Sequence, residues 1–384
     1  MRQIIHFAGN GSKPIYFIIL LLLLLSACQK NNKEVQLNQP ALNNIEGKKK
    51  NITKNADVAI DWYNLQLRII LNAHPAYANP VTIRVFSFTG ITLYEAVHNM
   101  IDHAPGMSRL LYQAPTLPKT NDDKNYFWPE AANAALAYMT KNLFPALTDQ
   151  NKGWIDSLEN YYDLKFNNFS GPSEFKRSQA YGRAVASAIY VWSKTDKFDL
   201  ANALYAPPVF PGAWVPTPPA FANAAVPYLG NVRPFMQIHL TGLTPPPPFA
   251  YSEDPSSDFY GMVKDLYDVS KNLTADQRNI ALYWNDVGAG VGYTPSGHAI
   301  SILNQILVKE NTGLAKAAQL FAKTGIGMWD GTIMCWRSKY AFNQLRPVTY
   351  IKNIIDNSWV PLIATPPHPE YPAAHAFITS SSMV

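Results

Sequence analysis

The stretch DWYNLQLRIIL at residues 61–71 shows the spacing that decides the fold class. Its large apolar side chains recur every three to four residues, which gathers them on one face of a helix and would scatter them in a strand. The same spacing returns along most of the chain, and Gly and Pro separate several of these segments. We expect helices at residues 61–71, 80–97, 128–143, 149–166, 173–193, 259–270, 297–308, 313–323 and 332–345.

A further helix is expected after Thr274, because Gln277 three residues on completes the pattern of a capping box. No convincing run of alternating apolar and polar residues points to strands. The predicted fold is therefore all-α, with two packed helical bundles. We place an N-terminal helical domain at residues 57–205 and a second helical domain at residues 251–384.

Residues 206–250 separate the two bundles and hold 12 of the 30 prolines of the chain. Proline fixes φ and lacks an N–H donor, so this segment is predicted to be neither helix nor central strand. Large apolar side chains lie among the prolines, and a solvated linker does not need them. We therefore predict an ordered, extended belt that packs over both halves. Its apolar residues are Phe210, Trp214, Phe221, Tyr228, Phe235 and Met236.

The first 27 residues have the features of an export signal. Two basic residues precede an apolar run at 15–25, which is shorter than the roughly 20 residues that a membrane-spanning helix needs. The sequence Leu-Ser-Ala-Cys that ends at Cys28 resembles a bacterial lipobox, which implies cleavage before Cys28 and acylation of its thiol. Because Gln29 stands where a retention signal would have Asp, we expect the outer membrane, on its periplasmic or surface face. The alternative is a plain secretory signal.

Residues 28–56 are rich in Asn and Lys and are predicted to form a disordered tether between lipid and folded part. Of the formal net charge of +5, residues 1–27 contribute +2 and the tether +4, so about −1 remains for residues 57–384. This balance gives no support for nucleic-acid binding. The hydrophobic share of 47% excludes a disordered chain, and two cysteines exclude a disulfide scaffold. Cys335, the one thiol beyond the tether, is expected to pack in the core.

Lys339 and Arg346 stand seven residues apart, and Pro347 follows them. Seven residues are nearly two helical turns, so both cations are expected to project from one face of a helix. Apolar residues surround them in the sequence, so the pair needs an anion. A planar guanidinium beside a point-charge ammonium suits an oxyanion such as phosphate. By itself this spacing is more often the mark of a solvated surface stripe.

The motif Lys-x6-Arg-Pro at 339–347, then 24 residues, then Pro-x-x-His at 372–375 resembles a known superfamily. It is that of the type 2 phosphatidic acid phosphatases and vanadium-dependent haloperoxidases. The segments at 212–221, 232–235 and 284–298 resemble its bacterial haloperoxidase-like branch. The resemblance runs from about residue 58 to the end of the chain, and it implies an all-α catalytic domain.

The resemblance also implies roles for single residues. Lys339 and Arg346 correspond to the pair that binds the oxygens of vanadate or phosphate. The second family motif, Pro-Ser-Gly-His, reads Pro-Ala-Ala-His here, so Ala373 cannot supply the hydroxyl of the family's Ser. The amide of Ala374 is still able to donate to an oxyanion at a helix N-terminus, and His375 keeps the acid–base position.

Two features of the sequence depart from the family's pattern of motifs. Residues 295–298 spell Pro-Ser-Gly-His in full but precede the two cations, against the family's order, so we assign His298 to structure or to the pocket wall. The family's third motif, with a second Arg and a further His, does not follow His375. We expect either that the given chain stops before this motif or that the site is incomplete. His239 and His368 are candidates that nothing in the sequence places.

The resemblance implies an exported lipoprotein that oxidises halide with peroxide at a protein-bound vanadate. Phosphomonoester hydrolysis through a phosphohistidine at the same site is the first alternative. A non-catalytic envelope lipoprotein is the second, because of Ala373 and the missing third motif. A metal hydrolase built from His298, His368 and Glu370 lacks any His-x-x-x-His spacing, so no metal-ion site is expected.

Overall fold

The computed structural model describes residue 47 and residues 55–101, 104–241, 244–285 and 292–383. The predicted export signal, Cys28 and nearly all of the predicted tether lie outside these residues. The chain divides into two units, residues 1–48 and 49–384, and the second unit is the subject below. Within the described ranges no helix is long and apolar enough to span a membrane.

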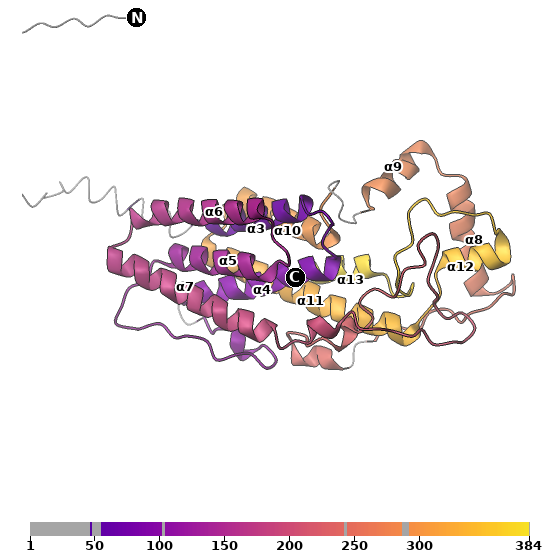
Figure 1. Cartoon of the computed structure of the whole chain (residues 1–384), viewed down its shortest axis with the longest axis horizontal. Helices are drawn as coiled ribbons and strands as arrows, with labels where there is room; N and C mark the ends of the chain where they lie inside the picture. Colours follow the sequence, from indigo (N-terminus) through magenta and orange to yellow (C-terminus); the bar gives the residue numbers. More distant parts are fainter. Residues whose placement is uncertain (1–46, 48–54, 102–103, 242–243, 286–291, 384) are drawn as a thin grey trace, which may run out of the picture. The chain divides into compact units, whose positions relative to one another are not determined.

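The described ranges are all-α, as predicted, with eleven α-helices and, apart from two isolated backbone bridges, no β-structure. The first half contains α3 (Asp57–Leu71), α4 (Asn79–Val97), α5 (Trp128–Leu143), α6 (Asp149–Asn167) and α7 (Pro172–Ser193) (Figure 1). The second half contains α8 (Asp258–Lys271), α9 (Ala275–Tyr283), α10 (Pro295–Lys309), α11 (Leu314–Phe342), α12 (Pro347–Tyr350) and α13 (Ala374–Ser382). The predicted capping box at Thr274 is present and begins α9.

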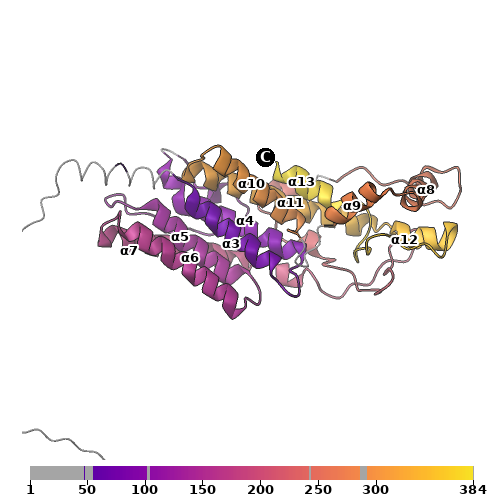
Figure 2. The same cartoon turned by 90° about the horizontal axis from the view of Figure 1, so that it is seen from above.

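Helix α11 is one helix of 29 residues, whereas the sequence pattern predicted two helices with a break near residues 324–331. Three glycines lie in that interval, and glycine weakens an isolated helix. Packing against other helices nevertheless keeps this glycine-containing segment helical. A Cβ on Gly325 would lie 2.7 Å from Ser87 Cα of α4, and one on Gly331 would lie 2.6 Å from Ser381 Oγ of α13. The glycines therefore let α4 and α13 pack closely along α11 (Figure 2).

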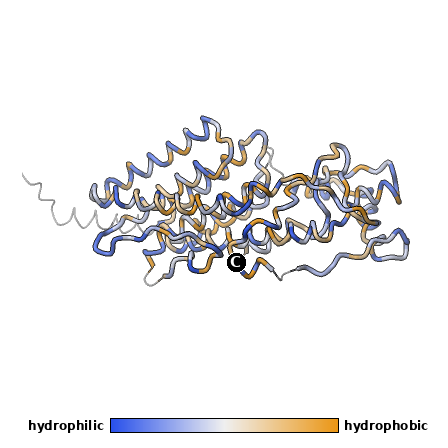
Figure 3. Tube along the Cα trace, turned by 60° about the horizontal axis from the view of Figure 1, so that its bottom comes forward, coloured by the Kyte–Doolittle hydropathy of each residue, from blue (hydrophilic) through white to orange (hydrophobic). Residues whose placement is uncertain are grey.

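One hydrophobic core takes side chains from both predicted helical domains. Tyr63 of α3 stacks on Phe321 of α11 with ring centroids 3.8 Å apart. Hydrophobic and hydrophilic residues alternate along the helices, as expected for helices with one buried face (Figure 3). A smaller cluster around Phe259, Tyr350 and Trp359 joins α8 to α12. The domain boundaries at 205/206 and 250/251 stay predictions.

The described parts of the proline-rich belt, residues 206–241 and 244–250, pack against helices, as predicted. The Trp214 side chain is fully buried, and its amide donates to the carbonyl of Asn343 at 2.8 Å. The amides of Phe235 and Met236 donate to the carboxylate of Asp330 on α11 at 2.7 and 2.9 Å. Two of the six apolar residues named for the belt, Phe210 and Phe221, are 46% and 62% exposed and so add little to this packing.

Candidate active site

The turn after α11 decides how Lys339 and Arg346 approach each other. The helix ends at Phe342, and Asn343 adopts the left-handed conformation with φ 50° and ψ 36°. Arg346 then has an extended backbone, with φ −81° and ψ 145°, because the ring of Pro347 disfavours helical geometry in the residue before it. The prediction that both cations share one helical face was therefore wrong. They meet because the chain turns between them.

A cavity of about 650 Å³ lies where these two cations meet. The loop before α13 forms its other side, and two backbone hydrogen bonds hold that loop in place. The Glu370 amide donates to the Gln344 carbonyl at 3.0 Å, and the Ala225 amide of the belt donates to the Pro367 carbonyl at 2.7 Å. The cavity brings together all the site residues predicted in the described ranges, which are Lys339, Arg346, Ala373, Ala374 and His375. Their catalytic roles stay predictions.

Lys339 is the most deeply buried charge at the cavity, with 1% of its surface exposed. Its Nζ donates to the carbonyls of Pro369 and Glu370 at 2.9 and 2.8 Å, which leaves one of its three N–H donors for a ligand. Burial lowers the pKa of Lys339 to about 8, and the positive charge of Arg346 adds to this lowering. Cys335 lies in the core beside Lys339, as predicted for a packing residue, and burial raises its pKa to about 11.

Arg346 uses three of its N–H groups on the protein. Its Nε donates to the His368 carbonyl at 2.6 Å, its Nη1 to Glu370 Oε2 at 2.6 Å and its Nη2 to His368 Nδ1 at 2.7 Å. Two of its five N–H donors remain for a ligand. The side chain of Glu370 is 38% exposed, so the carboxylate is the solvent-facing member of this ion pair.

His368 was left unplaced by the sequence, and the structure puts it in the cavity wall. A guanidinium can only donate, so Nδ1 of His368 accepts the hydrogen bond from Arg346. Burial lowers the pKa of His368 well below its usual value, and the charges of Arg346 and Lys339 lower it further. Burial first, and the two neighbouring cations second, thus favour the neutral form of this histidine. No motif in the sequence could have indicated this neighbour, since 22 residues separate it from Arg346.

The N-terminus of α13 completes the polar side of the cavity. Ala373 is its N-cap residue, with extended backbone and no side-chain cap. The first backbone hydrogen bond of the helix runs from the Phe377 amide to the Ala373 carbonyl at 3.3 Å. The amides of Ala374, His375 and Ala376 precede that bond, and the positive end of the helix dipole lies with them. This arrangement of donors fits an oxyanion.

Two further histidines named from the sequence, His239 and His298, do not line this cavity. His298 packs between the rings of Trp284 and Tyr293, with centroid distances of 5.9 and 6.0 Å, and it is not among the cavity's lining residues. His239 Nδ1 lies 2.7 Å from Asp330 Oδ2. In the described part of the chain, no three His, Cys, Asp or Glu side chains gather in a way that could hold a metal ion. A hydrolase using His298, His368 and Glu370 on one metal ion therefore has no structural support.

The fold and the cavity together define an all-α protein with a cavity lined by two cations, Lys339 and Arg346, and by the N-terminus of α13. A family model for the VCPO second helical-bundle domain matches residues 319–384. The structure is similar to the crystal structure of the first bacterial vanadium-dependent iodoperoxidase, with a TM-score of 0.76 and 28% identity. That match covers 86% of this chain and 79% of the other. Residues 319–384 therefore match a haloperoxidase domain, and the chain as a whole is vanadium haloperoxidase-like in its fold.

Two further solved structures share the fold. They are the apo-type and holo-type bacterial vanadium-dependent chloroperoxidases, each with a TM-score of 0.54. The apo-type is 16% identical over 81% of this chain and 78% of its own. The holo-type is 15% identical over 82% of this chain and 77% of its own. No curated protein matches the chain.

Proposed function

We propose that this chain binds vanadate in the 650 Å³ cavity and oxidises a halide with peroxide there. The observation that carries the proposal is the convergence of Lys339, Arg346 and the N-terminus of α13 on one cavity. Iodide is the first halide to test, because the similar structure with the highest identity of the three is an iodoperoxidase.

The donors at the cavity fit a small, multiply charged oxyanion. Lys339 and Arg346 keep three N–H groups beyond those used on the protein, and the amides of Ala374 and His375 add two. Ala373 offers no hydroxyl, so the backbone at the start of α13 takes over that side of the anion. Bound vanadate supplies the Lewis acidity that activates peroxide for attack by halide.

The protein's own groups then have separate tasks. Lys339 and Arg346 hold the oxyanion and offset its negative charge, which is most effective where water is excluded. His375, at the exposed start of α13, would accept a proton from peroxide at a ring nitrogen and donate it to the oxygen that leaves as water. The neutral ring of His368 keeps Arg346 oriented toward the cavity through its hydrogen bond at 2.7 Å.

The test is iodide- and bromide-dependent peroxidase activity after reconstitution with vanadate. We expect activity that requires vanadate, is lost in His375→Ala and is retained in His298→Ala, since His298 does not line the cavity. The same proteins are assayed for phosphomonoester hydrolysis without vanadate. Hydrolysis without any halide oxidation would assign the site to phosphate chemistry instead. Absence of both activities in a well-folded protein would favour a non-catalytic envelope protein.

We also infer that the protein is an exported lipoprotein of the bacterial outer membrane. The support is the signal-like N-terminus that ends in Leu-Ser-Ala-Cys28. Expression of the full chain in a bacterium followed by membrane fractionation tests this. We expect the protein in the outer-membrane fraction, with a mass increased by acyl chains on Cys28. Cys28→Ala should release the protein from membranes, and retention of that variant would contradict the inference.

A further inference from the structure

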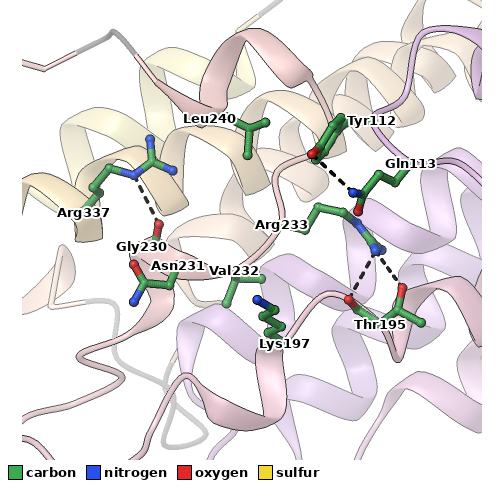
Figure 4. A pocket seen from close by; sticks show the side chains of 10 residues that line it. All are labelled: Tyr112, Gln113, Thr195, Lys197, Gly230, Asn231, Val232, Arg233, Leu240 and Arg337. Carbon is green, nitrogen blue, oxygen red and sulfur yellow. Dashed lines mark hydrogen bonds between the residues drawn. The ribbon is translucent and has the colours of Figure 1, made fainter.

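A second cavity, of about 380 Å³, shares no lining residue with the candidate active site. Segments far apart in the sequence meet there: the loop at 112–113, the turn at 195–197, the belt at 230–240 and helix α11 (Figure 4). Three of the lining side chains are cations, namely Lys197, Arg233 and Arg337. None of the described residues that line it is an Asp or a Glu.

Arg337 is held at the cavity by neutral backbone acceptors. Its Nε donates to the Gly230 carbonyl at 3.2 Å, and its Nη1 donates to the His239 carbonyl at 2.9 Å. The belt comes this close because residue 230 is Gly: a Cβ there would lie 2.6 Å from Arg337 Cα. Burial lowers the pKa of Arg337, so its charge is partly removed from water. The two N–H groups on Nη2 are not used by these bonds.

Arg233, another lining residue of the cavity, is likewise held by neutral acceptors. Its Nη1 donates to Thr195 Oγ1 at 2.6 Å and its Nη2 to the Trp192 carbonyl at 2.9 Å, while the guanidinium lies 4.8 Å from the centre of the Trp192 ring. Burial lowers the pKa of Arg233 as well. Lys197 is exposed, and within the ranges that the structure covers its ammonium makes no hydrogen bond or ion pair.

The two carboxylates that act on these arginines from a greater distance face other partners. Asp196 accepts from Arg84 Nε at 2.9 Å and from the Phe198 amide at 2.9 Å. Asp330 accepts from two belt amides and contacts His239 Nδ1 at 2.7 Å. Both are almost fully buried and neither lines the cavity. Three positively charged side chains therefore line this cavity, and no Asp or Glu is among its lining residues.

We propose that this cavity is a second anion-binding site, which takes a small molecule that carries a phosphate group. A phosphate dianion presents three oxygens and two charges to three cationic donors, whereas a carboxylate presents two oxygens and one charge. The volume of about 380 Å³ lies within the range of small-molecule sites. Gln113 and Asn231 add neutral donors to the lining, and Val232 and Leu240 are among its apolar members (Figure 4).

The test is calorimetric titration of the full chain with inorganic phosphate and with glycerol phosphate at constant ionic strength. Lys197→Glu reverses one lining charge without removing any hydrogen bond of the fold. Lys194→Glu is the matched control, because Lys194 is exposed, lies three residues earlier and does not line the cavity. Arg337→Met is the second variant. Arg346→Gln removes anion binding at the candidate active site, so the two sites are counted separately.

We expect two binding events in the wild-type protein and one in Arg346→Gln. Lys197→Glu should weaken that remaining event roughly tenfold or more, as for the loss of one charge-assisted hydrogen bond, and Lys194→Glu less than about twofold. Tighter binding of glycerol phosphate assigns the site to a phosphate ester, and tighter binding of inorganic phosphate assigns it to the free ion. A single event that Arg346→Gln abolishes would overturn the proposal, as would equal weakening by Lys197→Glu and Lys194→Glu.

Discussion

The carboxylate of Glu370 already forms an ion pair with the guanidinium of Arg346, which an oxyanion would also contact. Glu370 Oε2 lies 2.6 Å from Arg346 Nη1. An incoming anion must therefore compete with a charge of the protein itself. Glu370→Gln removes this charge and keeps the side chain's shape and an oxygen that accepts from Arg346. We expect vanadate and phosphate to bind more tightly to Glu370→Gln than to the wild-type protein.

The size of this effect follows from the geometry of the pair. Two unit charges about 4 Å apart interact with about 4 kcal/mol at the effective dielectric constant of a protein surface. The Glu370 side chain is 38% exposed, so solvent screens a large part of that energy. After screening, we take the interaction between Glu370 and Arg346 as about 1–2 kcal/mol. Its removal in Glu370→Gln corresponds to a gain in oxyanion affinity of about 5- to 30-fold.

The assay is calorimetric titration with vanadate at pH 7, beside thermal unfolding of the ligand-free protein. Glu370→Gln should bind more tightly and also unfold at a lower temperature, since Arg346 is only 8% exposed and loses its charge partner. Glu310→Gln, an exposed residue at the end of α10, controls for the change in net charge. Unchanged or weaker binding in Glu370→Gln would refute the placement of the oxyanion at Arg346.

Three further expectations concern stability. The pKa of Lys339 is about 8 in the folded state against 10.5 for an ordinary lysine, so the unfolded chain binds more protons between these values. Stability should rise with pH from 8 to 9.5 by about 1 kcal/mol per unit relative to Lys339→Met, measured by urea unfolding. Ala373→Ser gives α13 an N-cap hydroxyl and should add about 1 kcal/mol; no gain would contradict the extended cap geometry. Gly182→Ala would place a Cβ 2.1 Å from the Ala131 carbonyl oxygen and should cost roughly 1–3 kcal/mol, whereas Gly153→Ala, in open space on α6, should add about 0.5–1 kcal/mol.

The helices were predictable wherever their cause lies within a few residues. The bounds of α5 agree with the predicted segment, and the capping box at Thr274 begins α9 as expected. Helix α11 was predicted in two pieces because glycine propensity is a local rule. Its continuity comes from α4 and α13, which pack on those glycines and are distant in the sequence.

The residues of the candidate site could be predicted from the sequence, but their arrangement in space could not. Lys339, Arg346 and His375 were chosen from motif spacing, and all three line one cavity. The spacing argument nevertheless used the wrong local structure, since a left-handed Asn343 and the restriction before Pro347 turn the chain between the two cations. The neutral His368 had no sequence signal, because its position depends on a loop held by contacts to the belt and to the turn after α11.

The sequence by itself therefore determined the helical class, most helix bounds and the chemical types that line the cavity. Helical hydrogen bonds and caps join residues at most a few positions apart, so the pattern of apolar and capping residues carries them. Only the tertiary structure decided that Lys339 is buried enough to titrate near pH 8 and that Arg346 already contacts Glu370. Charge energies depend on which groups and how much water surround a side chain in space, and distance along the chain does not carry that information.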